Sequence, residues 1–260
     1  MTPHTPTVGF APEFSQRVRQ GFGLRAAAYE NHARLQQAMA WRLARLCRDL
    51  PLPSGPRADL GAGSGLLSRA LLHHCPALAG EPPLQIDHCP ELLARNPLVG
   101  SRVWDLNGGL PGDLRGAALL ASSFALQWLD APAAQLAHWC DRLRPEGWLA
   151  VALPTSGSFP QWHRAAAAAG VPCTALEFPD ARALRTVTRG RGLVLEHARV
   201  LRFSHPERGG LETLRHLRSL GAATSRHPPL GAGQLRRLLA HWPTATPLSW
   251  EVLLLVGRKS

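Results

Sequence analysis

The 260-residue chain contains very little lysine and very little tyrosine. Lys259 and Tyr29 are the single residues of their types, so nearly all of the positive charge comes from arginine. Together with abundant alanine, glycine and proline, this bias is typical of GC-rich coding. The formal net charge of +11 has two interpretations: a solvated arginine surface, or a surface for an acidic partner such as nucleic acid or an acidic carrier protein. A dense basic tract is absent, which disfavours nucleic acid.

Other absences limit where the protein acts. Apolar runs stay below about 18 residues, so no membrane span is expected. Residues 1–10 lack the charged-then-apolar pattern of a signal peptide, and a short flexible tail is expected there. The five cysteines form no C-x-x-C pair, which indicates a reduced, cytoplasmic setting. No metal is expected either, because the paired spacing of zinc ligands is missing from the group His73, His74, Cys75, His88 and Cys89.

Hydrophobic periodicity and helix-breaking residues predict an alternation of strands and helices. Strands are expected at 58–61, 84–87, 100–104, 116–122, 147–153, 194–203 and 250–257. Helices are expected at 14–22, 26–50, 66–74, 91–95, 131–143, 158–169, 211–220 and 234–241. Strands that alternate with helices are typical of a parallel, doubly wound α/β sheet. The last two strands differ, because a helical segment separates them.

The most informative segment is Asp59-Leu60-Gly61-Ala62-Gly63-Ser64-Gly65, which joins an expected strand to an expected helix. Its three glycines allow φ > 0 and remove Cβ atoms that would keep a ligand off the backbone. Such a turn is expected to point free N–H groups at the ligand. The acidic residue two positions before the first glycine repels a phosphate and attracts an ammonium group. The pattern therefore resembles the S-adenosylmethionine loop of class I methyltransferases.

Other polar residues follow the strands at the edge where such folds bind ligands. Asp87 is placed to accept bonds from ribose hydroxyls and Asp105 from the adenine amine, while Ser122 and Ser123 border the methyl group. Each aspartate alone is also typical of a turn or N-cap. Combined with the glycine loop, they predict a cofactor site made of Asp59, Gly61, Ala62, Gly63, Gly65, Asp87, His88, Asp105, Leu106, Ser122 and Ser123.

The segment after the fourth strand narrows the acceptor. Ser122-Ser123-Phe124-Ala125 lacks the Asn/Asp-Pro-Pro-aromatic pattern of enzymes that methylate amine nitrogens. Cys173 lies beyond the fifth strand, out of place for the nucleophile of a C5-pyrimidine methyltransferase. An oxygen nucleophile or a stabilised carbon is therefore favoured.

Several further segments, spread from about residue 22 to 259, form a recognisable pattern. They are Phe22-Gly23-Leu24-Arg25-Ala26-Ala27-Ala28-Tyr29-Glu30, His32, Leu35-Gln36, Phe124-Ala125-Leu126-Gln127-Trp128, Leu143-Arg144-Pro145-Glu146-Gly147, Ser156-Gly157-Ser158-Phe159-Pro160, Leu217-Arg218-Ser219-Leu220-Gly221-Ala222 and Pro247-Leu248-Ser249-Trp250. These segments resemble one family, the malonyl-acyl-carrier-protein O-methyltransferases of biotin synthesis. Two positions depart from it: Ser123 stands where the family often has Asn, and Trp250 where Tyr is common.

The resemblance implies a Rossmann-like class I methyltransferase fold. Its seven-stranded, mostly parallel sheet has an antiparallel last strand, N-terminal helices and a helical lid at about 206–243, between strands six and seven. Residues 1–20 would form a flexible tail and the start of the first helix, and 21–260 a single domain. The implied reaction methylates the free carboxylate of malonyl-acyl carrier protein or malonyl-CoA from S-adenosylmethionine. The methyl ester then primes pimeloyl synthesis for biotin.

A carboxylate is ionised at neutral pH, so this reaction needs no general base. An arginine can hold one carboxylate oxygen and leave the other to attack. Arg218 is the first candidate for this role, with Arg144 and Arg164 as alternatives. Arg218 could equally be a solvated residue of the lid that does not contact the substrate. Tyr29 is expected to contact the cofactor or the acyl group, or else to pack on the sheet. The remaining candidates line the acyl cavity or pack beneath it: Phe124, Gln127 and Trp128.

Three alternatives stay open from the sequence. One is methylation of another small carboxylate or hydroxyl, and the second, suggested by charge alone, is an RNA methyltransferase. The third is a binding module that keeps the fold without catalysis, which the intact set of Asp59, Asp87 and Asp105 disfavours. A monomer without membrane contact is expected.

Overall fold

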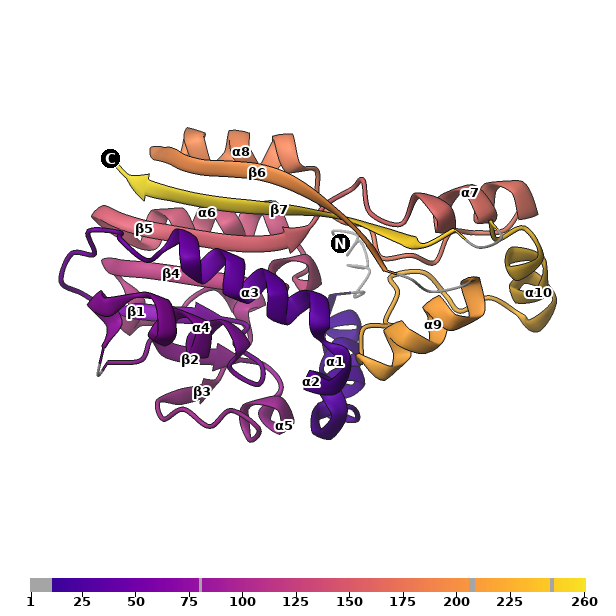
Figure 1. The fold of residues 1–260 in the computed structure, drawn as a ribbon, viewed down its shortest axis with the longest axis horizontal. Helices are drawn as coiled ribbons and strands as arrows, with labels where there is room; N and C mark the ends of the chain where they lie inside the picture. Colours follow the sequence, from indigo (N-terminus) through magenta and orange to yellow (C-terminus); the bar gives the residue numbers. More distant parts are fainter. Residues whose placement is uncertain (1–10, 80, 206–208, 244–245) are drawn as a thin grey trace, which may run out of the picture.

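Seven strands form one sheet in the spatial order β3-β2-β1-β4-β5-β7-β6 (Figure 1). The structure is a computed structural model that describes residues 11–79, 81–205, 209–243 and 246–260. The strands are β1 (Arg57–Leu60), β2 (Leu84–Asp87), β3 (Ser101–Val103), β4 (Ala117–Ser123), β5 (Leu143–Pro154), β6 (Leu193–His205) and β7 (Leu248–Lys259). The tail expected at residues 1–10 lies outside the described residues, as do 206–208 at the start of the expected lid.

Ten α-helices are described, together with short 3-10 turns. The helices are α1 (Ala11–Gly23), α2 (Tyr29–His32), α3 (Arg34–Leu46), α4 (Leu66–His74), α5 (Pro90–Leu93), α6 (Pro132–Arg142), α7 (Pro160–Ala169), α8 (Ala181–Gly190), α9 (Gly210–Ser219) and α10 (Ala232–Ala240). The turns are η1 (Ala26–Ala28), η2 (Pro76–Leu78), η3 (Leu106–Gly108), η4 (Gly112–Leu114) and η5 (Leu126–Trp128).

The strand directions confirm the predicted sheet. Strands β1 to β5 pair in parallel, and β7 runs antiparallel between β5 and β6. The chain moves outward from β1 to β3 and then returns to β4 on the other side of β1. This reversal opens a crevice beyond the carboxyl ends of β1 and β4, where ligands bind in sheets of this kind.

Alternate residues of the central strands build two cores, one on each face of the sheet. Ala150 of β5 packs in a cluster with Leu43 of α3 and Leu71 of α4. Its neighbour Val151 points to the other face and packs in the cluster of Trp139 on α6. The period of two along a strand therefore gives three layers, with helices covering both faces.

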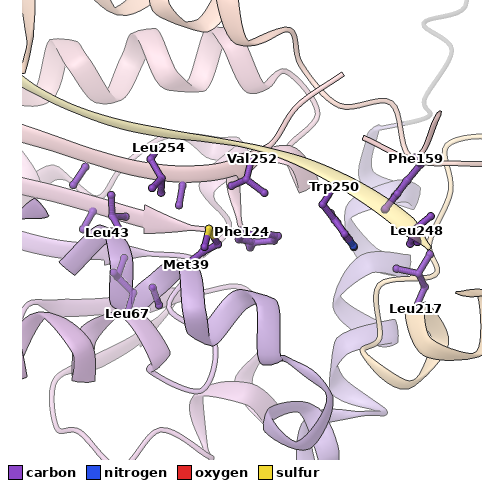
Figure 2. Packing of buried hydrophobic residues seen from close by; sticks show 14 of the residues in the cluster. Met39, Leu43, Leu67, Phe124, Phe159, Leu217, Leu248, Trp250, Val252 and Leu254 are labelled. Atoms are coloured by element: carbon purple, nitrogen blue, oxygen red, sulfur yellow. The ribbon is translucent and has the colours of Figure 1, made fainter. Parts of the chain in front are cut away.

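The core on the α3 and α4 face continues beneath α9. Figure 2 shows a row of buried residues on β7 that runs from Leu254 through Val252 and Trp250 to Leu248. Leu217 of α9 belongs to the same cluster and lies at the far end of this row. Helices α9 and α10 follow β6 and precede β7, which is the place where sequence analysis expects a helical segment.

Two helix predictions need correction. The helix expected over 26–50 is wrong in its continuity, because η1, α2 and α3 divide this stretch and Ala33, with ψ of 38°, separates α2 from α3. Ala33 is fully buried, and such a tertiary contact leaves no mark in hydrophobic periodicity. Helix α8 has no counterpart in the prediction. Its signal is Asp180, whose side chain caps the helix by accepting a 2.8 Å bond from the Ala183 N–H.

Candidate active site

The glycine loop after β1 adopts the backbone that its sequence predicts. Gly61, Gly63 and Gly65 have φ angles of +76°, +53° and +85°. A Cβ on Gly61 would lie 2.1 Å from the Ala125 Cβ, and one on Gly65 would lie 2.4 Å from the Asn96 Oδ1. Neither position therefore accepts a side chain, because both the φ angle and the space exclude it.

The loop differs from expectation in its N–H groups. Gly61 and Ala62 donate to the Ile86 carbonyl at 2.7 and 2.9 Å, and Gly63 donates to Asp87 Oδ2 at 2.8 Å. The expectation of free N–H groups at these positions is therefore wrong. The reason is that pairing between β1 and β2 continues into the loop. The loop is consequently fixed to the end of β2.

Asp87 is the residue that joins the loop to β2. Its two carboxylate oxygens accept bonds from Gly63 N–H and, at 2.7 Å, from Cys89 N–H. Burial raises the pKa of Asp87, while these backbone bonds act in the opposite direction. A carboxylate offers about four acceptor sites, so Asp87 keeps capacity for a ligand's hydroxyl groups.

Asp59 lies beneath the loop and is fully buried. Its Oδ2 accepts a 2.8 Å bond from the Ser68 hydroxyl, whereas its Oδ1 has no partner in the described part of the chain. Burial raises the pKa of Asp59 to about 7. A buried carboxylate with one unsatisfied oxygen fits a nearby ligand cation, such as an ammonium group, better than a phosphate.

A cavity of about 120 Å³ lies beside the loop. The predicted cofactor residues that line it are Gly61, Ala62, Gly63, Asp87, His88, Asp105, Leu106 and Ser123. Asp59, Gly65 and Ser122 lie outside its lining, and the Ser122 hydroxyl donates to the Leu60 carbonyl at 2.7 Å. We call this space the first cavity.

Helix α1 closes one side of the first cavity, a contribution that sequence analysis missed. Its Ser15 hydroxyl lies 3.4 Å from Asp105 Oδ2 and 3.4 Å from His88 Nδ1. Asn107 donates its backbone N–H to Asp105 Oδ1 at 2.9 Å. The Asp-x-Asn spacing is typical of such a turn, but the sequence offers no signal for the contact with Ser15.

A second cavity, of about 560 Å³, extends from the sheet edge to α9 and α10. Arg218 and Gln127 line it, together with Arg17 and Arg215. Its lining in the described part of the chain contains three arginines and no carboxylate. The other arginine candidates lie elsewhere: Arg144 donates to the Ser54 carbonyl, and Arg164 is an exposed residue of α7 outside both linings.

The two cavities share one wall. Five residues line both of them: Phe22, Tyr29, Gln36, Phe124 and Trp128. The ring of Phe22 makes edge contacts with Tyr29 and Trp128, at centroid distances of 6.1 and 5.4 Å. Burial, followed by the charges of Asp87 and Glu30, raises the Tyr29 pKa far above its usual range. The Tyr29 hydroxyl is therefore a neutral hydrogen-bond donor at this wall.

Sequence comparison identifies relatives across most of the chain, although no family model matches it. The malonyl-(acyl-carrier protein) O-methyltransferase of Magnetococcus marinus is 34% identical over 236 residues, which cover 86% of this chain and 84% of that protein. The chain belongs to the malonyl-(acyl-carrier protein) O-methyltransferase family. A second family relative is the biotin biosynthesis bifunctional protein BioCD of Bordetella avium, 34% identical over 241 residues. That match covers 88% of this chain, which spans about half (49%) of the bifunctional protein.

Solved structures of other proteins have the same fold as this member of the malonyl-(acyl-carrier protein) O-methyltransferase family. The YcgJ protein of Bacillus subtilis superposes with a TM-score of 0.56 at 11% identity, covering 85% of this chain and 98% of that chain. A Haemonchus contortus phosphoethanolamine N-methyltransferase, solved with S-adenosylhomocysteine, gives a TM-score of 0.54 at 14% identity, covering 99% and 62%. These likenesses establish the class I methyltransferase fold.

In residues 11–79, 81–205, 209–243 and 246–260, no helix is long and apolar enough to cross a bilayer. Among the same residues, no three His, Cys, Asp or Glu side chains gather closely enough to hold a metal ion.

Proposed function

We propose that this protein transfers a methyl group from S-adenosylmethionine to the free carboxylate of a malonyl thioester, carried on acyl carrier protein or coenzyme A. The product would be the methyl ester that primes pimeloyl synthesis for biotin. The observation that carries the proposal is the pair of cavities with a common wall. One is lined by the glycine loop and carboxylates, and the other by apolar residues and three arginines. The name of the Magnetococcus marinus relative supports this reaction, and the name of the Bordetella avium relative supports the link to biotin synthesis.

The residues of the first cavity fit S-adenosylmethionine. When bound, this cofactor supplies a methyl group activated by a positively charged sulfur. The unsatisfied oxygen of Asp59 suits the cofactor's ammonium group, directly or through a water, and Asp87 suits the ribose hydroxyls. Asp105 and Leu106 would face the adenine, and the Ser123 hydroxyl, which lacks a partner among the described residues, would lie near the methyl group.

The second cavity fits an anionic acyl chain. Its arginines attract the malonyl carboxylate, and its apolar lining excludes water from the reacting groups. No proton has to be removed, since the carboxylate is ionised at neutral pH. With the arginines holding the carboxylate, one of its oxygens would form the new bond to the methyl carbon, and the electrons of the broken carbon–sulfur bond would stay on sulfur, so both charges would disappear.

Arg218 and Tyr29 are the proposed catalytic residues. Arg218 lines the second cavity with an exposed side chain, which suits it to capture the carboxylate and hold one oxygen. Tyr29 lines both cavities and would contact the reacting groups. Phe124, Gln127 and Trp128 would complete the walls around the acyl group.

The net charge of +11 suits an acidic carrier protein as the donor of the malonyl group. Opposite charges speed association and make it sensitive to salt. The five cysteines are all free, which agrees with a reduced cytoplasmic setting. We infer a single catalytic domain over residues 21–260, with α9 and α10 as its lid, acting as a monomer.

A methyl-transfer assay with labelled S-adenosylmethionine tests the proposal. Malonyl-carrier protein, malonyl-CoA and acetyl-CoA are compared as acceptors, with RNA at two salt concentrations as a further arm. Transfer is expected to the malonyl thioesters alone. Equal labelling of acetyl-CoA would contradict methylation of the carboxylate, and labelling of RNA at moderate salt would indicate a nucleic-acid substrate.

A further inference from the structure

Gln36 lies at the wall between the two cavities and has no role in the reaction described so far. It comes from α3, lines both cavities and is 9% exposed. Within the described residues its carboxamide has no hydrogen-bond partner. Because this largely buried residue lines both cavities, a ligand bound there is the expected hydrogen-bond partner of its carboxamide.

The common wall carries no charged side chain. Its polar groups are the Gln36 carboxamide, the Tyr29 hydroxyl and the Trp128 indole N–H, and its other two residues are Phe22 and Phe124. The three arginines line the second cavity but not the first. Methyl donor and acceptor must meet where the cavities meet. The donors that the shared wall itself offers to the acceptor are therefore neutral.

We propose that Gln36 contacts the substrate and orients the malonyl carboxylate for attack. This proposal rests on the proposed function. Its Nε2–H donates to the attacking carboxylate, beside the Tyr29 hydroxyl, while Arg218 holds the group from the outer side. A carboxylate has about four acceptor sites, so one lone pair stays free to attack.

A neutral donor has a physical advantage over an arginine at this position. A guanidinium would neutralise the attacking carboxylate and repel the positively charged sulfur of the cofactor. The amide fixes direction and leaves the charge in place. The aromatic side chains around it lower the local dielectric, which strengthens the attraction between carboxylate and cofactor.

The first test is the pH dependence of Gln36→Glu with malonyl-CoA as acceptor. When ionised, the introduced carboxyl cannot donate and repels the substrate; when protonated, it can donate again. Burial next to a second carboxylate raises its pKa. At pH 8, kcat/KM is expected to fall at least ~100-fold, consistent with loss of a charge-assisted bond plus repulsion. At pH 6 the loss, taken relative to the wild type at the same pH, should shrink at least about tenfold.

Gln37→Glu is the matched control, because Gln37 is the next residue of α3 and is exposed. It adds the same charge and should leave kcat/KM unchanged at both pH values. A loss in Gln36→Glu of equal size at pH 6 and pH 8 would indicate a structural role and overturn the proposal.

Binding without turnover gives a second readout. In the presence of S-adenosylhomocysteine, Gln36→Met should bind malonyl-CoA about tenfold more weakly by calorimetry, with S-adenosylhomocysteine affinity unchanged. Wild-type affinity for malonyl-CoA in this variant would overturn the role of Gln36 alone. A wild-type protein that neither binds nor methylates a malonyl thioester would instead refute the proposed function.

Discussion

The Ser68 hydroxyl donates a 2.8 Å hydrogen bond to Asp59 Oδ2 beneath the glycine loop, and both side chains are fully buried. The second oxygen of Asp59 has no partner among the described residues. One hydrogen bond does not offset the burial, so the pKa of Asp59 rises to about 7. The cofactor-free protein therefore holds a carboxyl that is partly protonated at neutral pH.

This pair predicts that Asp59→Asn stabilises the cofactor-free protein in alkaline solution. A carboxyl whose folded pKa is raised favours folding most below its unfolded pKa near 3.8, and this contribution is lost as pH rises through 7. The difference of about 3 pKa units corresponds to roughly 4 kcal/mol once Asp59 is fully charged. Thermal denaturation should show a higher Tm for the variant at pH 8 and a smaller gap at pH 5. A gap that does not change with pH would contradict the shifted pKa.

Asp87 predicts a loss of cofactor affinity. Asp87→Ala removes the acceptor for the Gly63 and Cys89 N–H groups and the proposed partner of the ribose. Each hydrogen bond to a charged group is worth about 1.5–3 kcal/mol, so S-adenosylmethionine should bind roughly 10- to 100-fold more weakly by calorimetry. Asp113→Ala is the control, because Asp113 pairs with Arg102 outside both cavities and should leave affinity unchanged. Unchanged affinity in Asp87→Ala would place the ribose elsewhere.

Much of the fold was predictable because local chemistry determines it. The helix expected at 66–74 and the strand expected at 84–87 match α4 and β2 residue for residue. In both, apolar periodicity coincides with a clear start signal. Helix α4 begins after a glycine N-cap at Gly65, and β2 begins directly after a pair of prolines. The break at Ala33 was not predictable, because the burial of this residue in the folded chain leaves no mark in hydrophobic periodicity.

The candidate site also has a part that was predictable from the sequence and a part that was not. The loop and Asp87 are neighbours across paired strands, so strand order alone brings them together. Ser15 of α1 and Gln36 of α3 reach the cavities through the packing of their helices. Gln36 stands in a segment that carries the family resemblance, but nothing in the sequence indicates that either residue lines a cavity. The sequence predicted Asp59 as a carboxylate that attracts an ammonium group. Only the structure shows that it lies behind the loop and not on the cavity wall.

Arg218 predicts a defect confined to the acyl substrate. Its exposed side chain lines the second cavity and not the first, so Arg218→Ala should raise KM for malonyl-CoA about tenfold or more. Affinity for S-adenosylmethionine should stay the same. Arg182→Ala removes an equal charge from an exposed position of α8 outside both cavities, and should have no such effect. Wild-type kinetics in Arg218→Ala would transfer the capture of the carboxylate to Arg17 or Arg215, which line the same cavity.

Arg226 connects the segment between α9 and α10 to the rest of the active site. Its guanidinium donates to the Leu129 carbonyl at 2.7 Å, lies 3.9 Å from the centroid of the Phe14 ring and is 3.8 Å from Asp130 Oδ1. Leu129 lines the first cavity, and Ser225 and His227, the neighbours of Arg226 in the chain, line the second, so this contact links the walls of both cavities. The arginine therefore positions the lid segment against α1 and the loop after η5.

Arg226→Ala should weaken this connection and loosen both cavities together. Loss of the hydrogen bond, the cation–π contact and the partly exposed ion pair is expected to cost about 1–3 kcal/mol, with the ion pair the smallest part. In a domain of this size that lowers Tm by roughly 2–10 °C. KM for malonyl-CoA and the dissociation constant of S-adenosylmethionine should both rise, in contrast to Arg218→Ala. Arg226→Lys keeps the charge but not the planar stacking on Phe14, so it should recover only part of the loss. Full recovery would mean that charge alone holds the lid segment in place.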